Sequence, residues 1–182
     1  MKAYLQGFIY GDGAVYSRKN VKDYTVDIEQ KNKKFVHIIQ NLFKLEYGKE
    51  GRITTHKGLW RLRIYSKQVF EEFAAIKRFP IKAFRNLSDS DKILFISGLI
   101  DAEGNISRRR LRISNSNKEL LTEIKNFLEK MGINCGKVYP NTKERRVWIL
   151  GIYGKELRKL TKLLKLYNKK PPPRPLKWSR GR

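Results

Sequence analysis

The chain has 182 residues, of which 41 are Lys or Arg and 17 are Asp or Glu, so its formal net charge at pH 7 is +24. A charge of this size repels itself unless the partner is a polyanion, which favours nucleic acid. Because 40% of the residues are hydrophobic, the charge does not indicate disorder, and no apolar run approaches the roughly 20 residues that span a bilayer.

A single cysteine, Cys135, excludes an internal disulfide, and with only His37 and His56 available there is no zinc-site spacing. The N-terminus lacks the layout of a signal peptide. The basic residues are spread along the chain and not gathered in one amphipathic helix, which argues against a membrane-surface protein. We therefore expect an intracellular protein, cytoplasmic or organellar and not secreted, with no membrane partner.

Hydrophobic periodicity in the first half predicts helix, two strands, helix, two strands and helix. The expected bounds, in chain order, are helix 3–11, strands 14–19 and 23–30, helix 33–46, strands 51–55 and 59–65, and helix 67–76. In 33–46 the apolar residues recur with helical spacing, and Asn32 stands where an N-cap is expected.

The second half repeats this order. The expected bounds are helix 89–102, strands 105–114, 136–140 and 147–153, and helices 117–130 and 155–166. Leu120 corresponds to Phe35 (120 − 35 = 85) and Tyr153 corresponds to Tyr65 (153 − 65 = 88). Self-similarity over about ninety residues indicates two pseudo-symmetric half-domains, 1–87 and 88–170, each with a sheet covered by helices on one face. The Pro-rich basic stretch 171–182 predicts an extended tail.

Alternation along the predicted strands separates a core face from a charged face. In 59–65, one side carries Trp60, Leu62 and Ile64 and the other carries Arg61, Arg63 and Tyr65. In 105–114, one side carries Leu111 and Ile113 and the other carries Arg108, Arg110 and Arg112. Like charges along one side of a strand repel without an anion between them, and Arg suits phosphates and guanine edges. We therefore predict that a DNA duplex lies across the outer faces of the sheets.

The strand 23–30 departs from this pattern because Thr25, Asp27 and Glu29 should project outward together. Two interpretations remain open: the acids accept hydrogen bonds from cytosine amino groups in a major groove, or they form local salt bridges. The full set of candidate DNA contacts is Arg18, Thr25, Asp27, Glu29, Arg61, Arg63, Tyr65, Arg108, Arg110, Arg112, Lys137 and Arg145.

Two similar heptapeptides, GFIYGDG at 7–13 and GLIDAEG at 98–104, each end an apolar helix on an acid followed by glycine. Small residues four apart would let the two helices approach closely and bring Asp12 and Glu103 together. We expect Gly13 and Gly104 to end the helices in the left-handed conformation. Two carboxylates beside helix-end carbonyls are hard oxygen ligands that suit Mg²⁺. Beneath a cationic surface, such a site predicts hydrolysis of phosphodiesters.

The segments LQGFIYGDG at 5–13 and ISGLIDAEG at 96–104 resemble the paired signature motifs of the LAGLIDADG homing endonucleases, in the pattern of the single-chain members with two motifs. The resemblance extends over residues 3–168. It implies an α+β fold of two αββαββα half-domains whose antiparallel sheets form a saddle over DNA. It also implies a monomer, encoded by an intron or intein, that cleaves both strands of a long asymmetric target and leaves short 3′ overhangs.

The resemblance also implies roles for particular residues. The metal ligands would be Asp12, Glu103 and the carbonyls of Gly11 and Ala102, with Mg²⁺ as the cofactor and Mn²⁺ or Ca²⁺ as substitutes. Gln30 matches a polar residue that orders catalytic water in relatives, and Asn115 is its repeat mate (115 − 30 = 85). Relatives often place a basic residue near each metal centre, and the candidates here are Lys82 and Lys170.

The same fold serves other functions. An RNA-binding intron maturase would bind intron RNA, with or without nuclease activity. Loss of the acids would favour that interpretation, and because both acids are present the endonuclease interpretation leads. A transcriptional regulator with a degenerate nuclease domain would need a helix-turn-helix module, for which no residues remain. A basic ribosomal protein would explain the charge but not the repeated acids.

Overall fold

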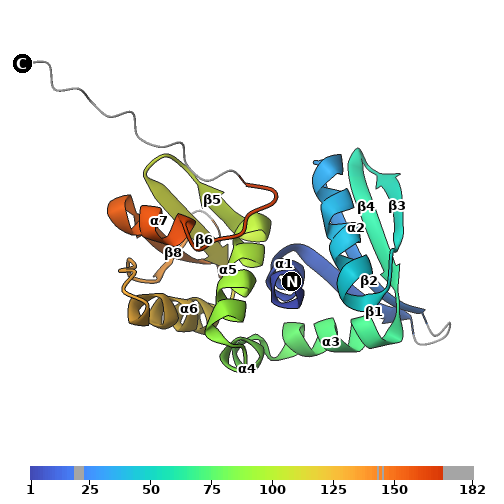
Figure 1. Ribbon diagram of the computed structural model, residues 1–182, viewed down its shortest axis with the longest axis horizontal. Helices are drawn as coiled ribbons and strands as arrows, with labels where there is room; N and C mark the ends of the chain where they lie inside the picture. The colour runs from blue at the N-terminus through green and yellow to red at the C-terminus, as the bar shows by residue number, and fades with distance from the viewer. Residues whose placement is uncertain (19–22, 143, 145, 170–182) are drawn as a thin grey trace, which may run out of the picture.

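The structure is a computed structural model that describes residues 1–18, 23–142, 144 and 146–169. Two four-stranded antiparallel sheets stand on either side of a central pair of helices, α1 (Lys2–Asp12) and α5 (Asp89–Glu103) (Figure 1). The predicted α+β fold with two antiparallel sheets is confirmed. No helix in the described part of the chain combines the length and the apolar character needed to cross a membrane.

The first sheet has the strand order β1-β2-β4-β3. Its strands are β1 (Gly13–Arg18), β2 (Asp23–Gln30), β3 (Arg52–His56) and β4 (Leu59–Tyr65). One face packs against α2 (Lys33–Tyr47) and α3 (Lys67–Arg78). Asn32 caps α2 as predicted, since its side chain accepts a hydrogen bond from the Phe35 N–H. The predicted bounds in this half agree with the structure to within two residues.

The second sheet has the equivalent order β5-β6-β8-β7. Its strands are β5 (Gly104–Ile106), β6 (Arg110–Asn115), β7 (Tyr139–Pro140) and β8 (Trp148–Tyr153), covered by α6 (Lys118–Lys130) and α7 (Gly154–Thr161). A short helix that the sequence did not predict, α4 (Pro80–Arg85), links the halves. The repeat extends to side chains: Lys33 Nζ lies 4.3 Å from the Trp60 ring centroid, and Lys118 Nζ lies 4.5 Å from that of Trp148.

The strand predicted at 105–114 is wrong, because the structure has two strands, β5 and β6, joined by a turn. In this turn the Ser107 N–H donates to the Arg110 carbonyl at 2.8 Å. The turn exposes Arg108, Arg109 and Arg110, so their like charges are solvated and not aligned along one strand. Arg108 therefore does not share the strand face of Arg110 and Arg112, as the sequence predicted.

Two other bounds in the second half differ. The strand expected at 136–140 is reduced to β7, because pairing with β8 covers only 139–140 and one further bond joins the Gly136 N–H to the Gly151 carbonyl. The helix expected at 155–166 ends at Thr161. Further along, the N–H groups of Lys165, Tyr167 and Lys169 donate to side chains of α5 instead, at Ser97 and Asp101.

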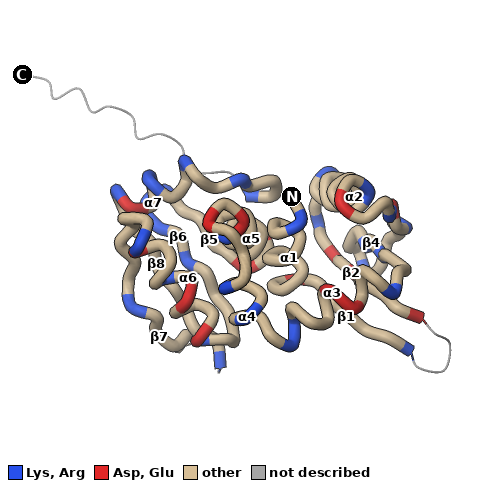
Figure 2. The backbone as a smooth tube through the Cα atoms, turned by 60° about the horizontal axis from the view of Figure 1, so that its bottom comes forward, with Lys and Arg blue, Asp and Glu red and all other residues tan. Residues whose placement is uncertain are grey.

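The strands place apolar side chains on the helix-covered faces. Leu62 and Ile64 of β4 are 0% and 1% exposed, and Leu111 and Ile113 of β6 are equally buried. Burying one such side chain stabilises the fold by about 1.5–3 kcal/mol. The opposite faces carry the arginines, and Lys and Arg segments occur along β4 and β6 in both halves (Figure 2). One face of each sheet therefore remains available to a partner.

Candidate active site

The two motif helices, α1 and α5, make the most extensive contact between elements of the described structure. Glycines on each helix face the backbone of the other. A Cβ on Gly7 would lie 1.9 Å from the Phe95 carbonyl oxygen, and one on Gly98 would lie 2.0 Å from the Tyr4 carbonyl oxygen. No real Cβ approaches a backbone atom so closely, so both positions require glycine. The predicted packing of the small-residue faces is confirmed.

The expectation that Gly13 and Gly104 adopt the left-handed conformation is wrong. Both are extended, with φ and ψ of −89° and 144° for Gly13 and −72° and 148° for Gly104, because a strand begins directly after each helix. Glycine is required here for space: a Cβ on Gly13 would lie 2.9 Å from the Ile9 Cα, and one on Gly104 would lie 2.6 Å from the Ile100 carbonyl oxygen.

Asp12 and Glu103 end α1 and α5, and the helix contact brings them together. A Cβ on Gly11, the residue before Asp12, would lie 3.2 Å from Glu103 Cγ. Each acid is held by an amide at the end of a neighbouring strand. Gln30 Nε2 donates to Asp12 Oδ2, and Asn115 Nδ2 donates to Glu103 Oε2 at 2.9 Å. The structure thus brings together four of the side chains that the sequence assigned to the site.

The orientation of the Asn115 amide is fixed by its other contacts. Its Oδ1 accepts a hydrogen bond from the Asn117 N–H at 2.9 Å and from the Tyr10 hydroxyl at 3.4 Å, which leaves Nδ2 facing Glu103. Tyr10 belongs to the first motif. The first half therefore helps to orient the amide that holds the acid of the second half.

Burial perturbs both acids. It raises the pKa of Glu103 to about 7, with the charge of Asp12 acting in the same direction, while the hydrogen bond from Asn115 and the charge of Lys77 oppose it. Burial also raises the pKa of Asp12, against the charges of Lys169 and Lys77 and the bond from Gln30. The Asp12 side chain reaches solvent, where water screens such effects, so Glu103 is the more strongly perturbed acid.

Two lysines lie at the carbonyl ends of the motif helices. Lys77, in the last turn of α3, donates from Nζ to the Tyr10 carbonyl at 2.8 Å. Lys169, in the segment after α7, donates from Nζ to the carbonyls of Ile100 at 2.9 Å, Ala102 at 3.4 Å and Gly104. Both ammonium groups therefore occupy the negative end of a helix dipole.

Burial lowers the pKa of both lysines, and nearby carboxylates oppose this: Glu103 and Asp12 at Lys77, and Asp101 followed by Asp12 and Glu103 at Lys169. Of the two lysines, Lys169 has the larger effect on Asp12 and Lys77 has the larger effect on Glu103. Of the two acids at the motif ends, each is therefore more strongly affected by the lysine of the opposite half, and the site is shared between the halves.

The sequence singled out two other lysines. Lys82 lies on α4, beside Arg78 and Arg85 in a surface depression of about 440 Å³, and Lys170 lies outside the described residues. Lys77 and Lys169 could have been identified from the number of residues that separates them. Lys169 and Lys77 are 169 − 77 = 92 residues apart, one more than the 103 − 12 = 91 that separates the acids.

The oxygen atoms at the site suit a hard divalent cation. Two carboxylates converge with helix-end carbonyls, and oxygen atoms of these kinds are the ligands that hard divalent cations prefer. The carbonyl of Ala102, an expected ligand, already accepts from the Lys169 ammonium, which shows that this helix end attracts positive charge. Burial, with a smaller contribution from the charge of Asp12, raises the pKa of Glu103 and so disfavours its charged form, which a bound cation would stabilise.

On the outer face of the first sheet, the two outward arginines of β4 are paired with acids of β2. Asp27 Oδ2 lies 3.2 Å from Arg63 Nε and 3.6 Å from Arg61 Nε. Glu29 pairs with Arg61 and, at 2.9 Å, with His56 Nδ1. Of the two interpretations that the sequence left open for these acids, the structure shows the local salt bridges. His56 is a member of this cluster that the sequence did not single out.

Thr25 and Asp27 lie on the outward face of β2 as predicted, opposite Tyr65 and Arg63 of β4, but they are only 1% and 7% exposed. Thr25 is paired across the sheet with Tyr16 on one side and Tyr65 on the other, and these larger side chains share its face. Tyr65 is 55% exposed, and Arg18, at the end of β1, is exposed as well. The accessible part of this face therefore includes Tyr65, Arg18, the outer parts of the paired arginines, and Arg52 of β3, which lies opposite Arg63.

On the second sheet, Arg110 and Arg112 face away from the buried side chains of β6, as predicted. Arg112 Nε is one of the few buried polar atoms that lack a hydrogen-bond partner within the described structure. Arg108 is exposed in the turn before β6, and Lys137 is exposed just before β7. Arg145, the remaining candidate, lies outside the described residues.

Comparison with known proteins identifies relatives of this chain. Residues 1–77 and 90–165 match the family model of the LAGLIDADG-like domain. The chain is 32% identical over 161 residues to homing endonuclease I-DmoI of Desulfurococcus mucosus, which covers 84% of this chain and 80% of that protein. It is 24% identical over 137 residues to an uncharacterized protein of Methanocaldococcus jannaschii, covering 72% of this chain and 49% of the other.

Solved structures show the same relationship. The crystal structure of I-DmoI in complex with DNA and Mn superimposes with a TM-score of 0.71 at 30% identity, covering 88% of this chain and 91% of that one. The N-terminal LAGLIDADG domain of DUF199/WhiA, with a TM-score of 0.64 at 18% identity over 92% of this chain and 81% of that one, shares the fold. The chain therefore belongs to the LAGLIDADG homing endonuclease family, in its single-chain form with two motifs.

Proposed function

We propose that this protein is a monomeric, site-specific homing endonuclease that makes metal-dependent double-strand breaks in a long asymmetric DNA target and leaves short 3′ overhangs. The observation that carries the proposal is the convergence of two acids, Asp12 and Glu103, at the ends of paired helices, each held by its own amide. One acid from each half provides one centre for each DNA strand. A structural role alone would not require two adjacent carboxylates whose pKa values are both raised.

The metal would be held by Asp12, Glu103 and the carbonyls of Gly11 and Ala102. A divalent ion bound there supplies a nucleophilic water and stabilises the leaving oxygen of a phosphodiester. We propose Mg²⁺ with Mn²⁺ as a substitute, because structures of the relative I-DmoI with DNA have been determined with Mn, Mg or Ca.

The protein's own side chains prepare the site. Gln30 and Asn115 hold the acids in place and are available to orient water between them and the phosphate. Lys77 and Lys169 compensate the negative charge that accumulates where two acids meet a phosphate. Because burial lowers their pKa values, either lysine gives up a proton more readily than an exposed lysine would.

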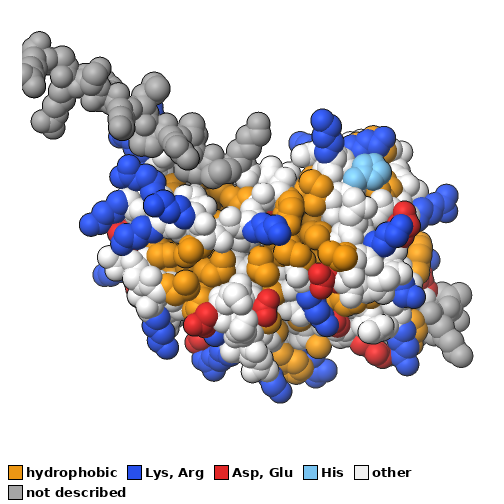
Figure 3. Space-filling view, viewed as in Figure 1, with side chains coloured by type: hydrophobic (Ala, Val, Ile, Leu, Met, Phe, Trp, Pro, Cys, Tyr) orange, Lys and Arg blue, Asp and Glu red, His pale blue; other side chains and the backbone are white. Residues whose placement is uncertain are grey.

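The duplex would lie across the outer faces of both sheets. On the first sheet the proposed contacts are Arg18, Glu29, Arg61, Arg63 and Tyr65, and on the second they are Arg108, Arg110, Arg112 and Lys137. Asp27 serves there as a buried partner that orients Arg61 and Arg63. The positive charge is not uniform over the molecule. On the face in Figure 3, apolar side chains occupy the middle and Lys and Arg stand mainly toward the edges.

The experiment that tests this function separates binding from cleavage. Duplexes from a randomised library are enriched on the purified protein in EDTA, and Mg²⁺ is then added to the enriched pool and the cut ends are sequenced. The wild type should cut at a fixed stagger, and the double variant Asp12→Asn, Glu103→Gln should bind the same duplexes without cutting them.

Two outcomes would overturn the proposal. If the wild type binds the enriched duplexes tightly but cuts none of them with Mg²⁺ or Mn²⁺, the protein has a binding role, such as that of an RNA-binding intron maturase. If the double variant loses binding as completely as cleavage, the acid pair is structural.

A further inference from the structure

Asp101, the first acid of the second motif, lies beside the proposed active site but does not belong to its metal ligands. It is 1% exposed and accepts three hydrogen bonds. The Tyr4 hydroxyl donates to Oδ2 at 2.7 Å, the Tyr167 N–H donates to Oδ2 at 2.6 Å, and the Lys169 N–H donates to Oδ1 at 2.9 Å. Two of the three donors are thus backbone groups of one segment, 165–169, which follows α7.

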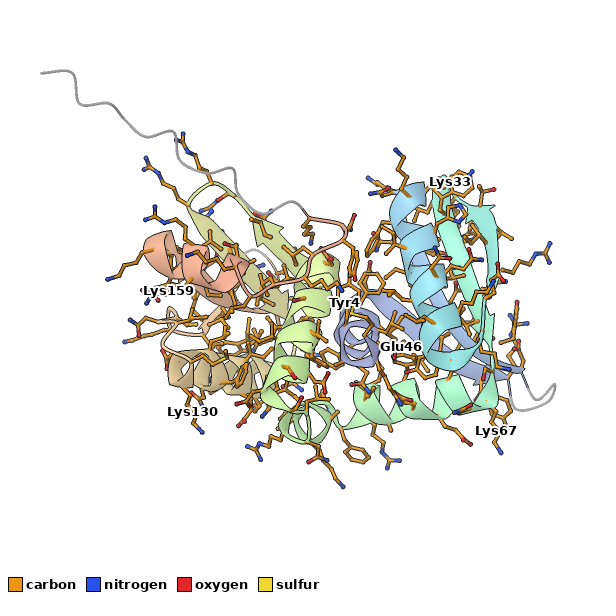
Figure 4. All side chains as sticks on the ribbon, in the orientation of Figure 1. Tyr4, Lys33, Glu46, Lys67, Lys130 and Lys159 are labelled. Atoms are coloured by element: carbon orange, nitrogen blue, oxygen red, sulfur yellow. The ribbon has the colours of Figure 1, made fainter. Side chains whose placement is uncertain are left out.

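This segment is tied to α5 along its length. The Lys165 N–H donates to Ser97 Oγ at 3.0 Å, one turn before Asp101 on α5. The Tyr167 ring packs edge to face on Tyr4, with 5.0 Å between the centroids. Tyr4 lies at the centre of the molecule, beside α5 (Figure 4). The segment ends with the Lys169 ammonium on the carbonyls at the end of α5, close to both acids.

The two halves deliver their lysines in different ways. In the first half Lys77 stands in the last turn of α3, so a continuous helix holds it. In the second half α7 ends at Thr161, eight residues before Lys169 (169 − 161 = 8), so no helix carries this lysine. The first motif has Tyr10 at the position of Asp101 (101 − 91 = 10), and Tyr10 makes no equivalent clamp. The carboxylate thus occurs in the half whose lysine is not held by a helix.

We propose that Asp101 is a positioning residue for DNA cleavage, which fastens the segment 165–169 to α5 and thereby places the Lys169 ammonium at the paired acids. The inference rests on the proposed endonuclease function, because it assigns the purpose of the clamp to that site. A buried carboxylate is costly unless hydrogen bonds satisfy it, and the segment supplies two of the bonds that the Asp101 side chain accepts.

Asp101→Asn tests the clamp with minimal change in shape. An asparagine has one acceptor oxygen, so its Nδ2 must face at least one donor. If Nδ2 replaces Oδ1, it opposes the Lys169 N–H, and if it replaces Oδ2, it opposes the Tyr4 hydroxyl and the Tyr167 N–H. Either orientation releases a backbone group of the segment. Ser97→Ala is the matched control, because it removes another backbone hydrogen bond of the segment to α5 and leaves the two bonds from the segment to Asp101 intact.

The activity measurement follows nicked and linear products from a supercoiled plasmid that carries an enriched target. Asp101→Asn should slow cleavage of one strand on the order of ten- to a hundredfold, the penalty expected for a misplaced catalytic group, so nicked circles accumulate. Lys169→Met should slow the same strand, and the double variant should be no slower than Lys169→Met. DNA binding should be unchanged, and Ser97→Ala should cut both strands at the wild-type rate.

Amide hydrogen exchange gives a second measurement that does not depend on activity. In the wild type the amides of Tyr167 and Lys169 should exchange as slowly as those of α5, and Asp101→Asn should make them fast. Fast exchange of these amides in the wild type would overturn the proposed clamp. So would additive effects of Asp101→Asn and Lys169→Met on the cleavage rate, or a loss of cleavage rate in Ser97→Ala as large as that in Asp101→Asn. If Lys169→Met cuts both strands at the wild-type rate while the amides are protected, Lys169 has no role in cleavage, and the proposed endonuclease function is unaffected. If the wild type cuts nothing, that function itself fails.

Discussion

Glu103→Gln removes the carboxyl whose pKa of about 7 lies well above its ordinary value of 4.5. Between these values the folded protein keeps a proton on Glu103 that the unfolded chain releases. The stability that this proton provides is present below pH 4.5 and is lost as pH rises toward 7. The difference, 7 − 4.5 = 2.5, corresponds to about 3 kcal/mol at about 1.4 kcal/mol for each pKa unit. Since Glu103 is partly exposed, we expect roughly half of this, about 1–2 kcal/mol.

Urea unfolding of the metal-free protein between pH 4.5 and 8 measures this directly. The wild type should lose stability relative to Glu103→Gln over this range, so that the variant is the more stable protein at pH 8. Glu71→Gln is the control, because Glu71 is 60% exposed on α3 and, within the described residues, forms an ion pair only with Lys67 on the same helix. Excess Mg²⁺ should restore the free energy of unfolding of the wild type at pH 8 and leave that of Glu103→Gln unchanged. A difference between the two proteins that is independent of pH would refute the burial of this acid.

Three further results are expected. Gly98→Ala should destabilise the protein by about 3 kcal/mol or more in thermal unfolding, because the new Cβ would lie 2.0 Å from a carbonyl oxygen of α1. Gly48→Ala is the control: Gly48 has φ 65° and no atom near its Cβ position, so the change should cost only about 1 kcal/mol in the same measurement. DNA affinity should fall on the order of a thousandfold between 50 and 200 mM salt, and a flat profile in a filter-binding titration would contradict the sheet-face interface. Arg63→Ala and Arg110→Ala should relax base preference in opposite halves of the target, and unchanged cut-site profiles for both variants would disprove the assigned strand faces.

The fold could be predicted from the sequence because its signals are local. The spacing of apolar residues in 33–46 and 117–130 and the N-caps Asn32 and Asn117 depend on neighbours a few residues away. The repeat then predicted that the two halves pair, which cannot be inferred from any local pattern. The β5–β6 turn was missed because an arginine-rich strand and an arginine-rich turn have the same composition.

The acids and amides of the site could also be predicted, because the motifs and the repeat mark their positions. The lysines could not. Lys77 reaches the site because α3 continues to Arg78, and Lys169 reaches it because the segment after α7 crosses α5. Both facts belong to tertiary structure. Gly13 and Gly104 follow the sequence rule for helix ends, but the strand that begins at each of them overrides it.

The contact between α1 and α5 makes the fit of the two halves a condition for chemistry. The same glycines that let the backbones touch also set the separation of the acids at the helix ends, and Tyr10 and Tyr4 reach from the first half into the second. A small loosening of this contact would misplace the acids of both proposed centres at once, while each sheet kept its shape and its arginines. An ill-fitting pair of halves would then hold DNA harmlessly and would not leave a single-strand nick. Half-domains recombined from different relatives should therefore be matched first at these helices and only then at the DNA-reading strands.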